Sequence, residues 1–402
     1  MFTELLLFTL IGIAFGIVTG ITPGVHINLV AVILLSVSPF LLQYFNALSI
    51  ACLIVAMSIT HTFLDFIPST FLGAPEEATA LSVLPAHRLL LRGMAYEAVR
   101  LSSIGSILAL IVVACSSIFL VKIVPFIYDL IKNYIGWILL FVVLFMILKS
   151  KKKNAIFWSA FVFLLAGVFG IVVFSLHMKD PLFPMFSGMF GVSMLLTSIF
   201  EKVAIPKQRL TEMIKVKKKS LLRATFAGSF SGVLTSIFPG LGPAQSAVVA
   251  SQVSGRLGIY SYIILIGGIG TASMMMSLIT LVSIEKARNG SIAVVQQLLQ
   301  NISTSDFYVF IATAFIAGGI AVFLSLYFAK MFSGLITKVN YQLLCVAIIL
   351  LIAILSIVLT GWIGFLILAI STSLGILPPL LKVARSHLMG CLLLPVILYF
   401  IL

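Results

Sequence analysis

The sequence predicts an all-α polytopic membrane protein that is built from two inverted-topology repeats, each beginning with a Pro-Gly broken-helix (re-entrant) hairpin. Three observations lead to this fold class. The composition is unusually apolar, two segments at residues 15–34 and 231–250 match each other, and the basic residues gather in short loops between apolar segments.

The apolar composition places the chain in a membrane. Hydrophobic residues make up 61% of its 402 residues, charged residues only 9%, and the mean hydropathy is +1.25. Soluble domains average roughly 45–50% apolar and about 25% charged residues, and their surfaces need polar cover. Because about 20 apolar residues span the hydrocarbon core, the chain has room for about ten spans. We expect a multi-pass protein of a prokaryotic cell (plasma) membrane.

The net charge of +14 comes from basic residues at the ends of apolar segments, such as Lys149, Lys151–Lys153 and the stretch from Lys202 to Arg223. This distribution follows the positive-inside rule, so we expect cytoplasmic loops that contact anionic membrane lipids, and no nucleic-acid partner. The cysteines stand singly, without metal or redox spacing, and are expected to be small core residues: Cys52, Cys115, Cys345 and Cys391. No metal and no cofactor are expected.

Residues 202–223 form the only long hydrophilic stretch of the chain. This predicts a first membrane repeat at residues 1–201, a basic cytoplasmic linker at 202–223 and a second membrane repeat at 224–402. The apolar segments and basic loops fit five full crossings before the second hairpin, and an odd number inverts the second half relative to the first.

The two matching segments carry the strongest signal. Aligned without a gap, seven of twenty positions are identical: Gly16/Gly232, Thr19/Thr235, Ile21/Ile237, Pro23/Pro239, Gly24/Gly240, Ala31/Ala247 and Val32/Val248. Proline removes a helical donor and glycine permits a sharp change of direction, so each Pro-Gly should break its helix. Broken helices at matching places in two halves point to the binding site of a transporter.

After each break a new half-helix begins, and its free N–H groups and positive dipole end favour an anion. The residues predicted to bind the substrate are Thr22, Pro23, Gly24, His26 and Asn28 in the first half, and Pro239, Gly240, Gly242, Gln245 and Ser246 in the second. The alternative is that the polar side chains among them cap their own helices. Valine at Gly24 or Gly240 should abolish binding, whereas valine at Gly12 should do much less.

Two pairs of ionisable residues are candidates for coupling transport to an ion. His61 and Asp65 lie four residues apart on one face of an apolar segment, where ionisable groups are costly and face a cavity or a partner. They would relay a proton or help to hold a cation, or form a neutral, internally hydrogen-bonded pair. Glu76 and Glu77 follow Pro75, as in the first turn of a helix, or coordinate the coupling ion. No third ligand stands at helical spacing to complete a zinc site.

Two stretches resemble a known family. GIVTGITPGVHINLVAVILL and FLGAPEEATALSVLPAHRLLLRGMAYEAVRLSSIGSILA are similar to segments of the large permease subunit of tripartite tricarboxylate transporters, the TctA family. The matching residues include Ala74-Pro75, Ala78-Thr79-Ala80-Leu81, Pro85, Gly93, Glu97-Ala98, Gly232, Pro239, Gly240 and Gly242. Ser82-Val83 replaces the Asp-Gly of the family pattern, and the second-half L-G-I-P-G-S stretch has no clear counterpart. The resemblance implies a transporter and a possible small membrane subunit or binding protein as partners.

The leading interpretation is a secondary active transporter (a symporter) of a small organic anion, a carboxylate, driven by a proton or sodium gradient. The first alternative keeps the fold and changes the cargo to an anionic lipid carrier such as polyprenyl phosphate. The second is an intramembrane enzyme, which the five histidines, the few acids and the lack of a G-x-S-x-G motif disfavour. We therefore expect no catalytic residues, and the lack of a P-loop argues against an ATP-driven pump.

Overall fold

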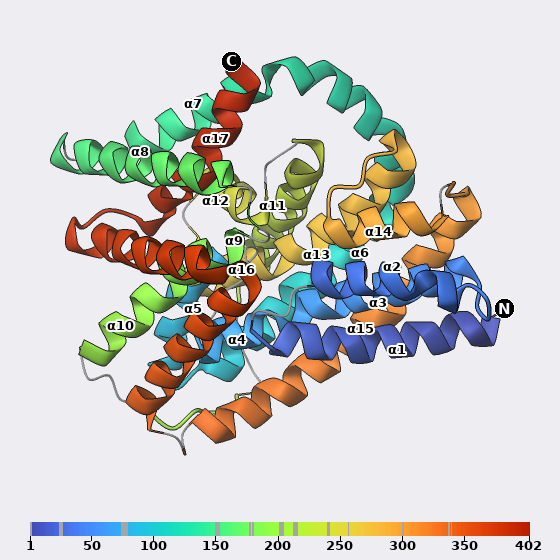
Figure 1. Cartoon of the computed structure of the whole chain (residues 1–402), viewed down its shortest axis with the longest axis horizontal. Helices are drawn as coiled ribbons and strands as arrows, with labels where there is room; N and C mark the ends of the chain where they lie inside the picture. Colours follow the sequence, from blue (N-terminus) through green and yellow to red (C-terminus); the bar gives the residue numbers. More distant parts are fainter. Residues whose placement is uncertain are drawn as a thin grey trace.

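The computed structural model describes residues 2–23, 27–73, 79–148, 153–176, 178, 181–200, 205–211, 216–238, 242–255, 257–299, 301–336, 338 and 340–402. Across this described part the secondary structure is helical and no strand is present (Figure 1). Eight of its helical segments are long and apolar enough to cross a membrane. The prediction of an all-α polytopic membrane protein is confirmed.

The helices run in chain order through the two halves of the sequence. The first half holds α1 (Phe2–Ile21), α2 (Ile27–Leu41), α3 (Ala47–Leu64), α4 (Phe66–Phe71), η1 (Ala80–Ser82), α5 (Val83–Leu90), α6 (Ala95–Ile131), η2 (Lys132–Tyr134), α7 (Ile135–Leu148), α8 (Lys153–Ser175), α9 (Leu182–Phe186), the π-helical turn η3 (Ser187–Val192) and α10 (Ser193–Phe200). The second holds α11 (Lys218–Ile237), α12 (Pro243–Val253), α13 (Ile259–Ile284), α14 (Gly290–Leu299), α15 (Thr304–Ile336), α16 (Tyr341–Leu380), η4 (Arg385–Met389) and α17 (Gly390–Ile401).

Both matching segments are interrupted helices. α1 ends at Ile21 and α11 ends at Ile237, two residues that the repeat pairs with each other. The next helices begin at Ile27 and at Pro243, which the same alignment also pairs. The helices therefore stop and restart at equivalent positions around each Pro-Gly. A twofold axis in the membrane plane and a re-entrant course of each hairpin stay predictions.

A first bundle is formed by α1, α3, α6, α11, α13 and α15, and its principal contacts are reciprocal between the halves. α1 packs along α3 as α11 packs along α13, and α3 packs on α15 as α13 packs on α6. Small residues allow these close approaches, as is usual between membrane helices. Gly16 lies against Thr60 in the first half and Gly232 against Ala272 in the second.

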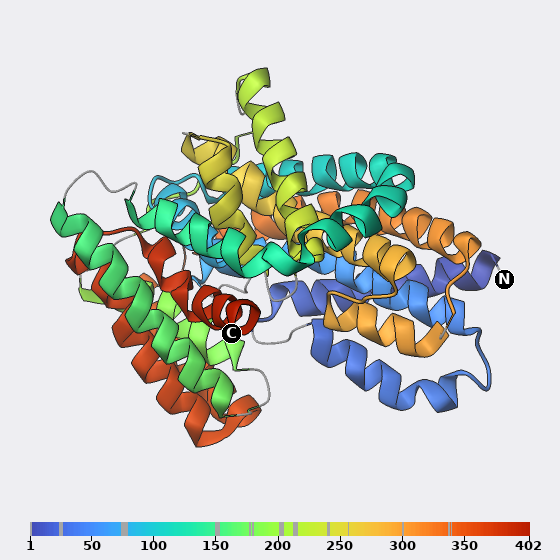
Figure 2. The same ribbon diagram turned by 90° about the horizontal axis from the view of Figure 1, so that it is seen from above.

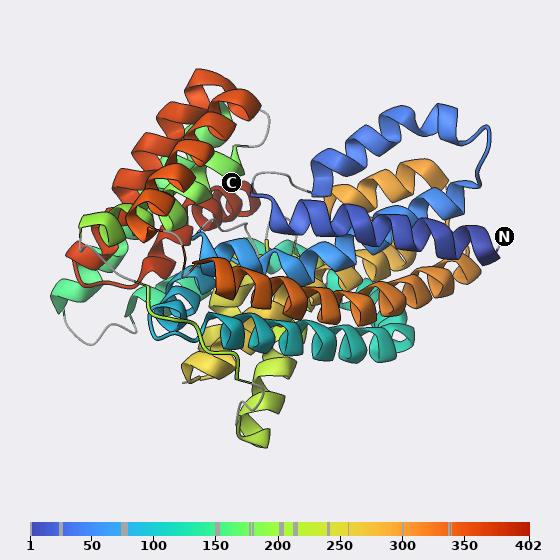
Figure 3. The ribbon, with the colours of Figure 1, turned by 90° about the horizontal axis from the view of Figure 1, so that it is seen from below.

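A second bundle is formed by α7, α8, α9, η3, α10, α16 and α17, and it stands beside the first one (Figures 2 and 3). The two halves also pack on each other here. α17 of the second half packs on α7 and α8 of the first, and α16 of the second half packs on α9, η3 and α10 of the first. The sequence predicts two apolar segments at residues 341–360 and 361–380, and α16 is divided at the boundary between them. Gly361 has a non-helical φ of 73° and ψ of −170°, so α16 consists of two helices that meet at this residue.

Three expectations from the sequence need correction. Gly12 is not a tolerant site, because a Cβ there would overlap the Leu53 carbonyl oxygen of α3. Cys115 is exposed on α6, whereas the other three cysteines are buried as expected. The short helix α14 was not expected, and the described residues 205–211 of the linker are packed against the first half. Gln208 accepts a hydrogen bond from the Ala95 N–H and donates one to the Leu90 carbonyl, each 3.0 Å long.

His87 of α5 connects the first half to the second bundle. Its Nε2 lies 3.2 Å from the hydroxyl of Tyr341 in α16 and 3.5 Å from the hydroxyl of Ser198 in α10. α5 is not one of the eight candidate spans. Burial, together with the positive charge of Arg385, lowers the pKa of His87 to about 4. The imidazole is therefore neutral at the junction of the two bundles near pH 7.

Replacing Gly105 by alanine should destabilise the first bundle. Its Cβ would overlap the Ile264 carbonyl oxygen at the contact of α6 with α13. Overpacking of this kind costs about 1–3 kcal/mol, which thermal or denaturant unfolding in detergent would measure. Gly319→Ala is the matched control, because nothing lies within 4 Å of a Cβ there. Equal stability of the two variants would contradict the close α6–α13 contact.

His87 should make stability fall in acid. The unfolded chain takes up the proton near pH 6.5 and the folded chain only near pH 4, so stability is highest above 6.5 and declines down to about 4. The loss is about 3 kcal/mol for this side chain. His87→Gln should remove that part of the decline in unfolding measured between pH 7 and 4, and exposed Arg88→Gln should not. An unchanged pH slope in His87→Gln would show that His87 is not held neutral.

Candidate functional site

The first break brings together the N-termini of two short helices, one from each half. Asn28, in the first turn of α2, accepts a hydrogen bond of 3.0 Å from the Ser291 N–H at the start of α14. A Cβ at Gly290 would lie within 2.8 Å of the Asn28 amide, so the two chains touch. Ser291 is also bound through its hydroxyl to Ser58 of α3, 2.9 Å away. Asn28 thus fixes α14 beside the break instead of only capping its own helix.

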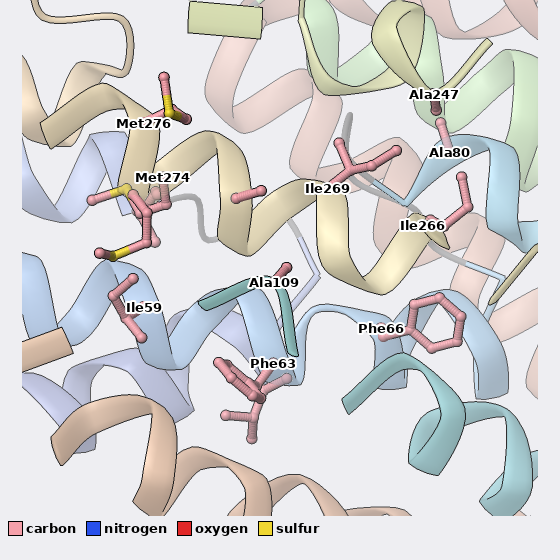
Figure 4. Close-up of a cluster of buried hydrophobic side chains, with 14 of the residues drawn as sticks. Ile59, Phe63, Phe66, Ala80, Ala109, Ala247, Ile266, Ile269, Met274 and Met276 are labelled. Carbon is pink, nitrogen blue, oxygen red and sulfur yellow. The ribbon is translucent and has the colours of Figure 1, made fainter. Parts of the chain in front are cut away.

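The second break has the reciprocal arrangement. Gly242 is the extended N-cap of α12 with no side-chain capping bond, and Pro243 occupies the first helical position. Figure 4 shows Ala247 of α12 next to Ala80 of η1, which belongs to the first half. Each restarted helix therefore lies beside a segment of the opposite half: α2 beside α14, which follows α13, and α12 beside η1, which follows α3 and α4.

The described residues of the breaks differ in what they offer a ligand. Thr22 is exposed and Pro23 is half-buried. The hydroxyl of Ser246 is fully buried and donates to the Gly242 carbonyl, 2.8 Å away, so its proton is used inside its own helix. Of these three described side chains, only that of Thr22 has an exposed hydroxyl.

Part of the predicted site lies outside the described residues: Gly24, His26, Glu76, Glu77, Pro239 and Gly240, together with the side chain of Gln245. The structure therefore says nothing of these positions. Among the residues that it does describe, no group of three His, Cys, Asp or Glu side chains could hold a metal ion.

The predicted coupling pair lies deep in the first bundle. His61 is 3% exposed and Asp65 is 4% exposed. Asp65 stands at the junction of α3 and α4, where its N–H binds the His61 carbonyl, 2.9 Å away. Its own carbonyl accepts a bond from Ser69, whose hydroxyl lies 2.6 Å from that of Thr79. The pair is therefore enclosed among hydroxyl groups and not at a surface.

Thr19 and Thr235 were not among the predicted site residues, although both are identical positions of the repeat. Thr19 Oγ1 lies 3.2 Å from His61 Nδ1 and donates to the Gly16 carbonyl. Thr235 donates to the Gly232 carbonyl and to the Ser273 hydroxyl, 2.9 Å away. Each threonine thus ties the helix before a break to the following span, and Ser273 occupies the place that His61 has in the first half.

The comparisons with known proteins agree with this architecture. The model of the tripartite tricarboxylate transporter TctA family matches residues 6–390. The chain belongs to this family. Members of the TctA family work in tripartite transporters with a small membrane subunit and a binding protein. The protein is thus a multi-pass membrane protein of a transporter family, which disfavours an enzyme.

A relative of this TctA-family protein is an uncharacterised protein of Methanocaldococcus jannaschii. It is 30% identical over 407 residues, which cover 98% of this chain and 99% of the relative. No solved structure matches the chain.

Asp65→Asn should impair the use of an ion gradient more than folding, because asparagine keeps the size and removes the ionisable group. We expect at least a tenfold loss of proton- or sodium-driven citrate uptake into proteoliposomes at equal protein content. Asp129→Asn is the control, since it removes an equal charge at an exposed position. Unchanged dependence on both gradients in Asp65→Asn would exclude Asp65 from coupling.

Proposed function

We propose that this TctA-family protein is a secondary active transporter that moves a small carboxylate, driven by a proton or sodium gradient. The anion would lie between the two helix breaks. The observation that carries this proposal is the contact of Asn28 with Ser291, which holds the N-termini of α2 and α14 side by side at the first break. The family membership and the interrupted helices support the same conclusion.

Helix N-termini suit this task because their first N–H groups have no partner within the helix and their dipoles favour negative charge. At the first break the Ser291 N–H of α14 is already donated to the side-chain oxygens of Asn28 and Asn289, so α14 would contribute its dipole and not this N–H group. The second break supplies the uncapped start of α12. A carboxylate would therefore be held mainly by the backbone, as in transporters that bind substrate at broken helices.

Coupling to an ion would pass through the helix that precedes the first break. His61 contacts Thr19 of α1, and Thr19 stands one turn before exposed Thr22. A proton or sodium ion that binds at His61 and Asp65 would change the charge directly behind the break. Glu76 and Glu77 remain proposed contributors on the basis of their place in the sequence. The small membrane subunit and binding protein of the family are its proposed partners.

A second candidate is the transport of an anionic lipid carrier such as polyprenyl phosphate. It is favoured by the apolar face of α2, the helix that follows the first break. Its exposed side chains include Val32, Ile33, Val37 and Phe40. A phosphate at the helix N-termini could then leave its apolar tail along α2. Competition between citrate and a short-chain polyprenyl phosphate for the purified protein would separate the two cargoes.

Valine in place of Gly24 or Gly240 should abolish the binding of carboxylate, because the Pro-Gly sequence predicts a sharp bend at these positions and a branched side chain would hinder it. The loss of two charge-assisted hydrogen bonds, each worth about 1.5–3 kcal/mol, weakens binding about a hundredfold or more. Titration of citrate into the purified protein would measure this loss of affinity.

The matched control is Gly319→Val, since a Cβ at Gly319 has no neighbour within 4 Å. It replaces Gly12, whose close contact with α3 makes it unsuitable. If both break variants fold and bind citrate with near wild-type affinity, the substrate site lies elsewhere and the repeat serves only packing.

A further inference from the structure

A cavity of about 320 Å³ opens where α5, the linker, α11 and α13 meet, away from the two breaks. We propose that it binds the phosphate group of an anionic phospholipid. This site is separate from the proposed transport site and does not depend on it. Its lining carries two cations, Arg92 and Lys217, and none of the described residues that line it is acidic.

Two helix starts face this cavity. Lys217 is the N-cap of α11 and Gly258 is the N-cap of α13, and neither forms a side-chain capping bond. By contrast, Asn46 and Asn340 cap α3 and α16 through their side chains. The free N–H groups and the dipoles of α11 and α13 therefore add to the charge of Arg92 and Lys217, which favours a phosphate.

Ser261 supports the site independently of the helix starts. This residue lines the cavity and is only 5% exposed, and its hydroxyl forms no hydrogen bond with any residue that the structure describes. Polar groups in protein interiors normally have a partner, so a largely buried hydroxyl that lines a cavity is available to donate to a ligand there. Together with the half-buried hydroxyls of Ser220 and Tyr260, it offers donors to phosphate oxygens.

The surroundings favour a lipid over free phosphate. Leu89, Val216 and Ile259 add apolar surface to the cavity lining. An apolar stripe continues along α11 just beyond Ser220 at helical spacing: Leu222, Phe226 and Phe230 are 57%, 61% and 48% exposed. α11 projects from the body of the molecule, so that this stripe is open to acyl chains (Figure 2). The polar cavity for a headgroup and the apolar stripe for acyl chains thus lie next to each other.

The test measures binding of three probes to the purified full chain in detergent. Dioctanoyl phosphatidylglycerol carries both phosphate and chains, dioctanoylglycerol has only the chains, and inorganic phosphate has only the anion. We expect phosphatidylglycerol to bind at least tenfold more tightly than either of the others. If inorganic phosphate binds as tightly, the ligand need not be a lipid and the proposal is overturned. If dioctanoylglycerol binds as tightly, the phosphate group plays no part in recognition and the proposal is also overturned.

Variants then place the site. Arg92→Gln combined with Lys217→Gln should weaken phosphatidylglycerol binding at least tenfold. Lys218→Gln combined with Lys219→Gln, which removes the same charge outside the cavity lining, should change it less than twofold. Equal loss in the two double variants would reduce the effect to general electrostatics and overturn the pocket. Ser261→Ala keeps every charge and should weaken binding at least threefold; wild-type affinity in this variant would also count against the site.

Discussion

An interrupted helix inside an apolar bundle must find partners for the backbone groups that the interruption exposes, and much of this structure follows from that constraint. α1 and α11 end just before a Pro-Gly, and the next helices begin at Ile27 and Pro243. At the first break the opposite half brings in α14, which Asn28 holds in place. At the second break η1 comes to lie against α12. The repeated Pro-Gly therefore gives two helix starts, those of α2 and α12, and each has the positive end of a helix dipole.

The two halves share their framework but differ in chemistry. Thr19 and Thr235 make equivalent bonds to the span behind each break, yet the first reaches His61 and the second reaches Ser273. Among the described residues that face these two threonines, the first half thus has the ionisable His61 and the second half has the neutral hydroxyl of Ser273. This division suits a transporter in which both halves hold the cargo and one half senses the coupling ion.

Much of the fold was predictable because composition and local sequence determine it. The lengths of the apolar segments predicted membrane-spanning helices. The identical positions of the repeat, from Gly16/Gly232 to Val32/Val248, predicted the interrupted helices. The reciprocal packing was not predictable, since it depends on which small residues face each other, as Gly105 does with Ile264. The role of Asn28 was missed in part because Ser291 lies 263 residues away. α14 has no signal beyond a short apolar run, and its position comes from tertiary contacts.

His87 forms a polar link to the second bundle through Tyr341 and Ser198. A small second core around Tyr341, Cys345 and Ile352 lies beside this link. The first bundle carries the breaks and the coupling pair.

The central claim is that a small anion binds between the two breaks through helix N-termini. An experimental structure of the full chain with bound citrate tests it most directly. The account predicts ligand density within hydrogen-bonding distance of the first turns of both α2 and α12. Ordered citrate at another place, with both breaks empty, would contradict it.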